Sequence, residues 1–230
     1  MNVKIKRQRY PGAEPYWQTF VYNGPKDITV ASLLDEINYR DDIVDIEGNP
    51  APRIGWECAC LQGMCGACAM VICGTPALAC ETFLRDLKGE TVTIEPLTKF
   101  PVIADLVVDR SRIEESLKEA DAYIRDYKPS EKTGKAAQKE YELQYQTAKC
   151  LKCGLCLEVC PNYKGGERFF GALFANDCYL IDSQSGDAAP EIKDVFDEHF
   201  AAGCSKSLSC MDVCPMKIET IASIARMSRK

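Results

Sequence analysis

CLKCGLCLEVCP, residues 150–161, is the stretch that decides the fold of the second half of this chain. Its spacing is C-x2-C-x2-C-x3-C-P, the run with which bacterial-type ferredoxins hold iron–sulfur clusters. In a two-cluster module the first three cysteines bind one cluster, and the cysteine before the proline binds the other. The run therefore predicts a second group of cysteines further along the chain.

That second group lies near the C-terminus, as Cys204, Cys210 and Cys214-Pro215, with Ser207 where another cysteine would complete the run. The crossed arrangement predicts two ligand sets, Cys150, Cys153, Cys156 and Cys214 for a [4Fe–4S] cluster, and Cys160, Cys204 and Cys210 for the other. A serine hydroxyl competes poorly for iron beside soft thiolates, so the set with three cysteines predicts a [3Fe–4S] cluster. A pair of structural zinc sites is the alternative, although zinc gives no reason for the crossed C-x3-C-P ends.

An earlier loop carries a different cysteine pattern. Cys60, Cys65, Cys68 and Cys80 follow the spacing C-x4-C-x2-C…C, which is the plant-type [2Fe–2S] signature. Gly63 and Gly66 permit positive φ, and small residues let backbone N–H groups approach the sulfur atoms. Three further cysteines fit no ligand spacing, and we expect them to be small buried apolar side chains: Cys58, Cys73 and Cys178.

Apolar periodicity in the first part of the chain predicts a small mixed domain. Alternation at Val3 and Ile5 and the aromatic run 16–22 predict strands, and Asp27 or Thr29 can cap the helix that follows. Beyond the cysteine loop, residues 69–79 predict a hairpin that carries Cys80 back to the loop, and residues 91–94 predict another strand. We therefore expect a plant-type ferredoxin domain of the β-grasp type over residues 1–100.

The second part of the chain predicts helices. From Ile103 to Tyr127 apolar residues keep helical spacing, and further helical patterns follow the cysteine run, around 169–180, 192–200 and 218–227. We expect an all-α, bacterial-ferredoxin-like domain over residues 101–230. The fold class is therefore α+β, with the [2Fe–2S] site in the first domain and the two other sites in the second.

Composition limits the setting in which the protein works. The net charge of −6 argues against nucleic acid, which calls for a basic surface. Residues 1–10 lack the apolar region of a signal peptide, and no apolar run is long enough to span a membrane. With 14 cysteines in such a chain, we expect a reducing, cytoplasmic compartment. No dinucleotide-binding motif and no paired acid and base are identifiable, so the sequence predicts no catalytic residues of its own.

Together these motifs resemble the iron–sulfur subunit of fumarate reductases and succinate dehydrogenases. The likeness covers nearly the whole chain and includes CGACAM at 65–70, LACETFLR at 78–85, FPVIADLVVD at 100–109 and LIDS at 180–183. The segment 78–109 is closer to the fumarate reductase branch. The resemblance implies an electron carrier between FAD in a catalytic subunit and quinone at a membrane anchor, with or without haem. It also implies a peripheral position on the cytoplasmic face of the cell membrane and the order flavin, [2Fe–2S], [4Fe–4S], [3Fe–4S], quinone.

The chain departs from this family's pattern on the quinone side. Many quinone-reducing members have a tryptophan shortly after the first Cys-Pro, where this chain has NYKGG at 162–166, and a histidine where it has Ser205. Lys217, beside the expected [3Fe–4S] region, is the residue that we expect to contact the quinone. An alternative keeps the three clusters but serves another flavin-linked reductase with a different, soluble electron partner.

Overall fold

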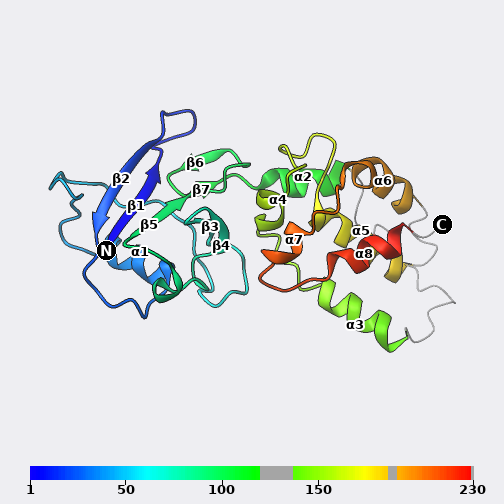
Figure 1. Ribbon diagram of the computed structural model, residues 1–230. Coiled ribbons are helices and arrows are strands. Elements are labelled where there is room, and N and C mark those ends of the chain that lie inside the picture. The colour runs from blue at the N-terminus through cyan, green and yellow to red at the C-terminus, as the bar shows by residue number, and fades with distance from the viewer. Residues whose placement is uncertain (120–136, 186–190, 229–230) are drawn as a thin grey trace. The chain divides into compact units, whose positions relative to one another are not determined.

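The computed structural model describes residues 1–119, 137–185 and 191–228 (Figure 1). The chain divides into two compact units, Met1–Asp109 and Arg110–Lys230. The first unit contains the strands and the second is helical, so the α+β class expected from the sequence is confirmed.

A five-stranded sheet organises the first unit. Its strands are β1 (Asn2–Arg7), β2 (Tyr16–Val21), β3 (Ala69–Ile72), β4 (Thr75–Leu78) and β5 (Thr91–Glu95). They lie in the order β2-β1-β5-β3-β4, in which only the central β1–β5 pair is parallel. The alternation seen in the sequence is the pleat of β1, which buries Val3 and Ile5 completely and leaves the residues between them partly exposed.

One α-helix completes the core beneath this sheet. Helix α1 (Val30–Asn38) begins after Thr29, whose hydroxyl accepts the backbone N–H of Ser32 at 3.2 Å. Thr29 is thus the cap, and Asp27 lies outside the helix. The helix buries Leu33, Leu34 and Ile37 with the sheet residues. A short 3-10 helix, η1 (Leu84–Asp86), precedes β5.

Residues 101–109 belong to the first unit, beyond the expected boundary at residue 100. The segment forms a small hairpin of β6 (Val102–Ala104) and β7 (Val107–Val108), and the expected helix from Ile103 is wrong over this stretch. Asp105 sits at the turn with a left-handed φ of 48°. Its carboxylate meets the guanidinium of Arg7, with 2.8 Å from Nε to Oδ1, and accepts the N–H of Gly55 at 2.8 Å. These contacts hold the hairpin against β1.

The second unit is built of helices. They are α2 (Ser111–Glu119), α3 (Gln138–Thr147), α4 (Leu155–Val159), α5 (Ala172–Ser185), α6 (Ile192–His199), η3 (Ala201–Gly203), α7 (Ser209–Asp212) and α8 (Thr220–Met227). Helix α5 packs against α6 and α8, and α4 packs against α7. Because α4 and α7 each lie within a cysteine run, their contact brings together cysteines that are far apart in the sequence. The part of the expected helix beyond Glu119 falls outside the described residues.

Among the described helices, α5 contributes the largest set of buried apolar side chains to this unit. It buries an aromatic and aliphatic set that includes Leu173, Phe174 and Tyr179. The phenol of Tyr179 donates to Glu140 at 2.8 Å, and Arg226 of α8 binds the same carboxylate at 2.9 Å. These contacts join α3, α5 and α8. No helix in the described ranges is both long enough and apolar enough to cross a membrane.

Candidate iron–sulfur sites

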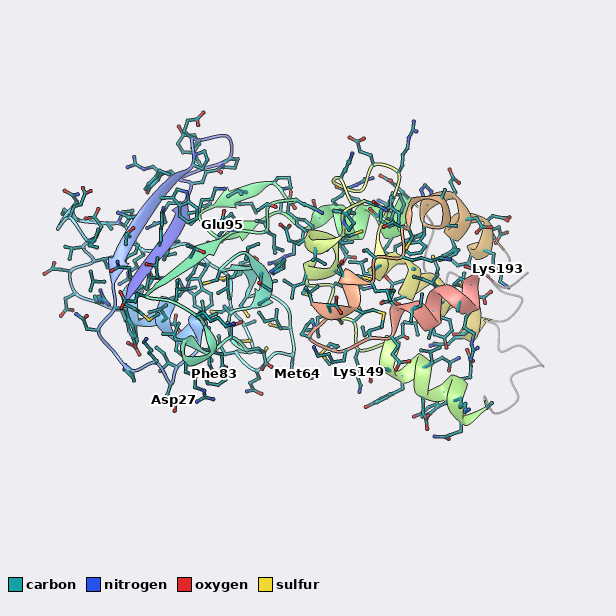
Figure 2. The ribbon with its side chains drawn as sticks, in the orientation of Figure 1. Asp27, Met64, Phe83, Glu95, Lys149 and Lys193 are labelled. Carbon is teal, nitrogen blue, oxygen red and sulfur yellow. The ribbon has the colours of Figure 1, made fainter. Side chains whose placement is uncertain are left out.

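The first cysteine loop turns its backbone N–H groups toward sulfur atoms. The Sγ of Cys60 accepts the N–H of Gln62 at 3.4 Å and that of Met64 at 3.3 Å. Gly63, in a left-handed conformation with φ of 69°, donates its N–H to the Sγ of Cys80 at 3.2 Å. Met64 itself points outward and is 62% exposed (Figure 2). Glycine at this position therefore lets the loop wrap closely around the thiols.

The four cysteines of this loop lie within reach of one another. The Sγ atoms of Cys68 and Cys80 are 3.4 Å apart, and Cys65 donates a hydrogen bond to Cys60. Backbone N–H groups lower the pKa of Cys60 to about 7, whereas burial raises the pKa of Cys80 to about 12. Four thiols with inward N–H donors have the donor chemistry of a [2Fe–2S] site.

The hairpin that returns Cys80 to the loop is the one expected from the sequence. Cys73 and Gly74 form its two-residue turn, with φ of 48° and 76°, and the N–H of Ala79 donates to the carbonyl of Cys68 at 3.0 Å. The expectation of burial for the three remaining cysteines is correct only for Cys178. Cys58 and Cys73 are exposed, because one lies in the cysteine loop and the other at the hairpin turn.

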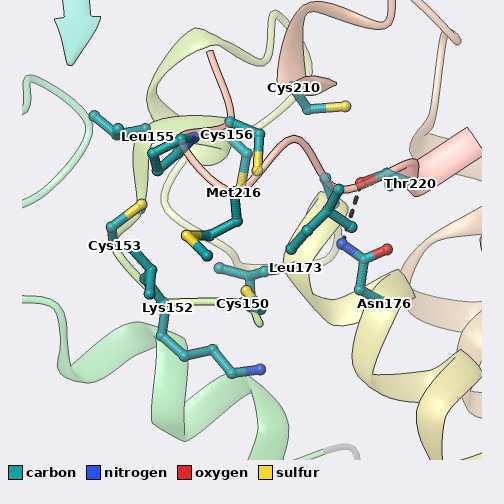
Figure 3. A pocket seen from close by; sticks show the side chains of 16 residues that line it. Cys150, Lys152, Cys153, Leu155, Cys156, Leu173, Asn176, Cys210, Met216 and Thr220 are labelled. Atoms are coloured by element: carbon teal, nitrogen blue, oxygen red, sulfur yellow. Dashed lines mark hydrogen bonds between the residues drawn. The ribbon is translucent and has the colours of Figure 1, made fainter. Parts of the chain in front are cut away.

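A second site lies in the helical unit, around a pocket (Figure 3). Five cysteines line this pocket, which we call the four-cysteine pocket after the four that were expected to bind the [4Fe–4S] cluster: Cys150, Cys153, Cys156 and Cys214. The fifth is Cys210, which was expected at the other site of this unit. Gly154, with φ of 87°, turns the chain into α4 so that Cys153 and Cys156 both face the pocket. Burial raises the pKa of Cys153 to about 11 and that of Cys156 well above its usual value.

A third site, which we call the three-cysteine pocket, collects the remaining expected ligands, Cys160, Cys204 and Cys210. Burial raises the pKa of Cys210 to about 11, and the neighbouring thiols of Cys160 and Cys204 raise it further. Ser207 lines the same pocket, and its Oγ accepts a hydrogen bond from Ser209 at 3.4 Å. The serine therefore lies where the sequence pattern has its missing cysteine.

The donor sets are made of cysteine thiols, which are the ligands that iron–sulfur clusters require. Among the residues that the structure describes, no three His, Cys, Asp or Glu side chains converge to hold one metal ion. The thiols of the helical unit line two pockets, and each pocket has cysteines from both runs, as a crossed two-cluster module requires.

Some polar residues at these sites were not expected, and one expected residue lies elsewhere. Lys217 is exposed and does not line the three-cysteine pocket, whereas Lys206 and Ser205 do. Lys152 lines the four-cysteine pocket and pairs with Asp177 of α5. The sequence shows Lys152 between two cysteines, but nothing in the spacing indicates a partner on a helix that begins at Ala172.

Comparison with known proteins places the chain among iron–sulfur electron carriers. Residues 2–115 match the family of 2Fe-2S iron-sulfur cluster binding domains, and residues 146–218 match the 4Fe-4S dicluster domain. The fold matches a chain of the Mycobacterium smegmatis Sdh1 complex in the apo form, with TM-score 0.79, 24% identity, and coverage of 99% of this chain and 95% of that one.

Two curated relatives give the particular family. The succinate dehydrogenase iron-sulfur subunit of Bacillus subtilis is 32% identical, over 98% of this chain and 90% of the relative. The fumarate reductase iron-sulfur subunit of Escherichia coli is 31% identical, over 97% of this chain and 90% of the relative. The chain belongs to the family of iron–sulfur subunits of succinate dehydrogenases and fumarate reductases, and its role is electron transfer. These two identities do not separate the branches.

Proposed function

We propose that the chain binds three clusters through eleven cysteines. Cys60, Cys65, Cys68 and Cys80 hold [2Fe–2S]; Cys150, Cys153, Cys156 and Cys214 hold [4Fe–4S]; Cys160, Cys204 and Cys210 hold [3Fe–4S]. The observation that carries this assignment is the crossing of the two C-terminal runs: Cys214 lines the first pocket of the helical unit, and Cys160 lines the second. The finer fold names follow the same proposal, a β-grasp domain and a bacterial-ferredoxin-like domain.

Bound in these sites, the clusters supply one-electron redox chemistry. The chain's own residues hold and shield them. Backbone N–H groups in the first loop stabilise the thiolate of Cys60, and buried side chains such as Leu155 and Leu173 keep water from the four-cysteine pocket. No residue is assigned a catalytic role, so substrate chemistry falls to a partner subunit.

The family supplies the partners in this proposal. The chain connects a flavoprotein subunit, which carries FAD, with a membrane anchor where quinone reacts, and it lies on the cytoplasmic face of the cell membrane. It carries electrons either in fumarate reduction or in succinate oxidation. Lys217 is proposed as a contact on the quinone side, and Lys206, which lines the three-cysteine pocket, is a natural comparison.

Analysis of the metal content tests the assignment. Anaerobically purified protein should contain about nine irons per chain, the sum of the three clusters. Stoichiometric zinc, or about eleven irons or more, would contradict the ligand sets. On the quinone side, Lys217→Met in the assembled complex should raise the KM for quinone and leave dye-linked activity unchanged, with Lys206→Met measured beside it.

A further inference from the structure

Lys152 occupies an unusual place within the first cysteine run. It lies between Cys150 and Cys153 with a left-handed φ of 53°, and its backbone N–H donates to the sulfur of Cys150. A non-glycine residue in this region of φ is uncommon and commonly marks a constrained position. Figure 3 shows Lys152 on the same loop as the two cysteines, with its ammonium group outside the ring of thiols.

The ammonium group of Lys152 has a partner on α5. Its Nζ forms an ion pair with Oδ2 of Asp177, whose side chain is only 15% exposed. Burial raises the pKa of Asp177, and the nearby Lys152 charge lowers it. A carboxylate in such a position is costly unless it is paired, so the lysine and the aspartate depend on each other.

The two charges lie differently with respect to the pocket. Lys152 is one of the residues that line it, whereas Asp177 is not, and its carboxylate is reached only through the lysine. The positive end of the ion pair is thus the closer one to the cysteines. A positive charge beside this pocket stabilises the more negative, reduced form of whatever redox group the pocket holds.

We propose that the Lys152–Asp177 pair sets the midpoint potential of the [4Fe–4S] site: Lys152 raises it, and Asp177 limits the rise. The inference rests on the proposed function, because it assumes that Cys150, Cys153, Cys156 and Cys214 bind that cluster. The midpoint potential of this site determines how readily the cluster is reduced, so the pair influences the rate of electron transfer through the chain. Both residues are positioning residues, since neither touches the iron.

The test is an EPR-monitored redox titration of the full chain. Asp177→Asn leaves the charge of Lys152 without its counterion and should raise the midpoint potential of the [4Fe–4S] cluster. The expected rise is about 59 mV, which corresponds to about a tenfold change in the one-electron reduction equilibrium. Replacing both residues, Lys152→Met with Asp177→Asn, removes the pair without leaving a buried charge and should lower the potential below that of the wild type. Lys152→Arg keeps the charge and should stay close to the wild type.

Lys149 offers a matched control on the other flank of Cys150. Its ammonium contacts Gln146 at 2.9 Å and the ring of Tyr145 at 4.6 Å (Figure 2). Lys149→Met should therefore leave the potential unchanged. A shift as large as that of the double variant would mean that any nearby charge suffices, and it would overturn the assignment to this pair.

A purely structural role predicts another outcome. If the pair only attached the loop to α5, Asp177→Asn and the double variant would both lose the cluster, or both would shift its midpoint potential in the same direction. Either result would show that the proposal is wrong. If the double variant fails to load, Asp177→Asn alone decides, since an unchanged or lowered potential contradicts the proposal. Absence of any [4Fe–4S] signal in the wild type would instead refute the proposed function.

Discussion

Arg7 and Asp105 form a buried ion pair that joins β1 to the turn between β6 and β7. Arg7 is 1% exposed, its Nη2 lies 2.9 Å from Oδ2 of Asp105, and its Nε lies 2.8 Å from Oδ1. The same guanidinium donates to the carbonyl of Arg53 at 2.9 Å, and Asp105 accepts the N–H of Gly55. The pair therefore also anchors the segment that leads into the first cysteine loop.

Loss of one partner of the Arg7–Asp105 pair should lower the stability of the protein. Asp105→Asn leaves the Arg7 charge buried without its counterion, and we expect a loss of about 3 kcal/mol of stability. Glu95→Gln is the control, because it breaks the half-exposed Lys6–Glu95 pair and should cost less than about 1 kcal/mol. Urea unfolding of the full chain, followed through the circular dichroism of the [2Fe–2S] site, compares the two variants. Equal losses of stability in the two variants would contradict the expectation that the Arg7–Asp105 pair contributes more to stability than the Lys6–Glu95 pair.

The reactivity of the first loop should depend on pH in cluster-free protein. Backbone N–H groups lower the pKa of Cys60 to about 7, so its thiolate persists down to neutral pH. The pKa of Cys58, two residues away, is raised by partial burial of its thiol and by the charge of Asp35. Iodoacetamide should therefore modify Cys60 first at pH 7, and its rate should fall about tenfold per pH unit well below that value. Mass spectrometry of the labelled peptides measures both sites, and parallel labelling of Cys58 and Cys60 from pH 6 to 8 would contradict the expectation.

The isolated chain should transfer electrons without performing substrate chemistry. Dithionite should bleach its visible absorption, because the clusters accept electrons. With artificial dyes it should neither reduce fumarate nor oxidise succinate, since no acid–base residues are assigned to a substrate site. The control is the same preparation combined with its flavoprotein partner, which should show turnover. Activity of the flavin-free chain alone would reveal a catalytic site that we have not identified.

Much of the architecture follows from local pattern. Alternation predicted β1, and helical spacing and a cap predicted α1. The cysteine spacings predicted that Cys214 lies with the first run and Cys160 with the last, but they did not indicate that Cys210 lines both pockets of the helical unit. The sequence patterns failed where contacts between distant residues determine the local structure. Ile103 and Leu106 have helical spacing, yet β6 and β7 form a hairpin because Asp105 binds Arg7, 98 residues earlier in the chain. The Lys152–Asp177 pair is likewise a contact between distant residues, 25 apart, which no spacing rule indicates.

The central claim is that the third site holds three irons because Ser207 replaces a cysteine. Ser207 lines the pocket of Cys160, Cys204 and Cys210, so Ser207→Cys would supply a fourth thiolate there. The added thiolate should let the site take up a fourth iron and lower its potential, because it makes the site more negative.

EPR of air-oxidised and dithionite-reduced samples tests this claim most directly. The wild type should show the near-isotropic signal of an oxidised three-iron cluster. Ser207→Cys should lose that signal while the [2Fe–2S] signal stays unchanged, which serves as the internal control. A wild type without the three-iron signal, both as isolated and after mild oxidation, would contradict the account, because another group would then hold a fourth iron in that pocket.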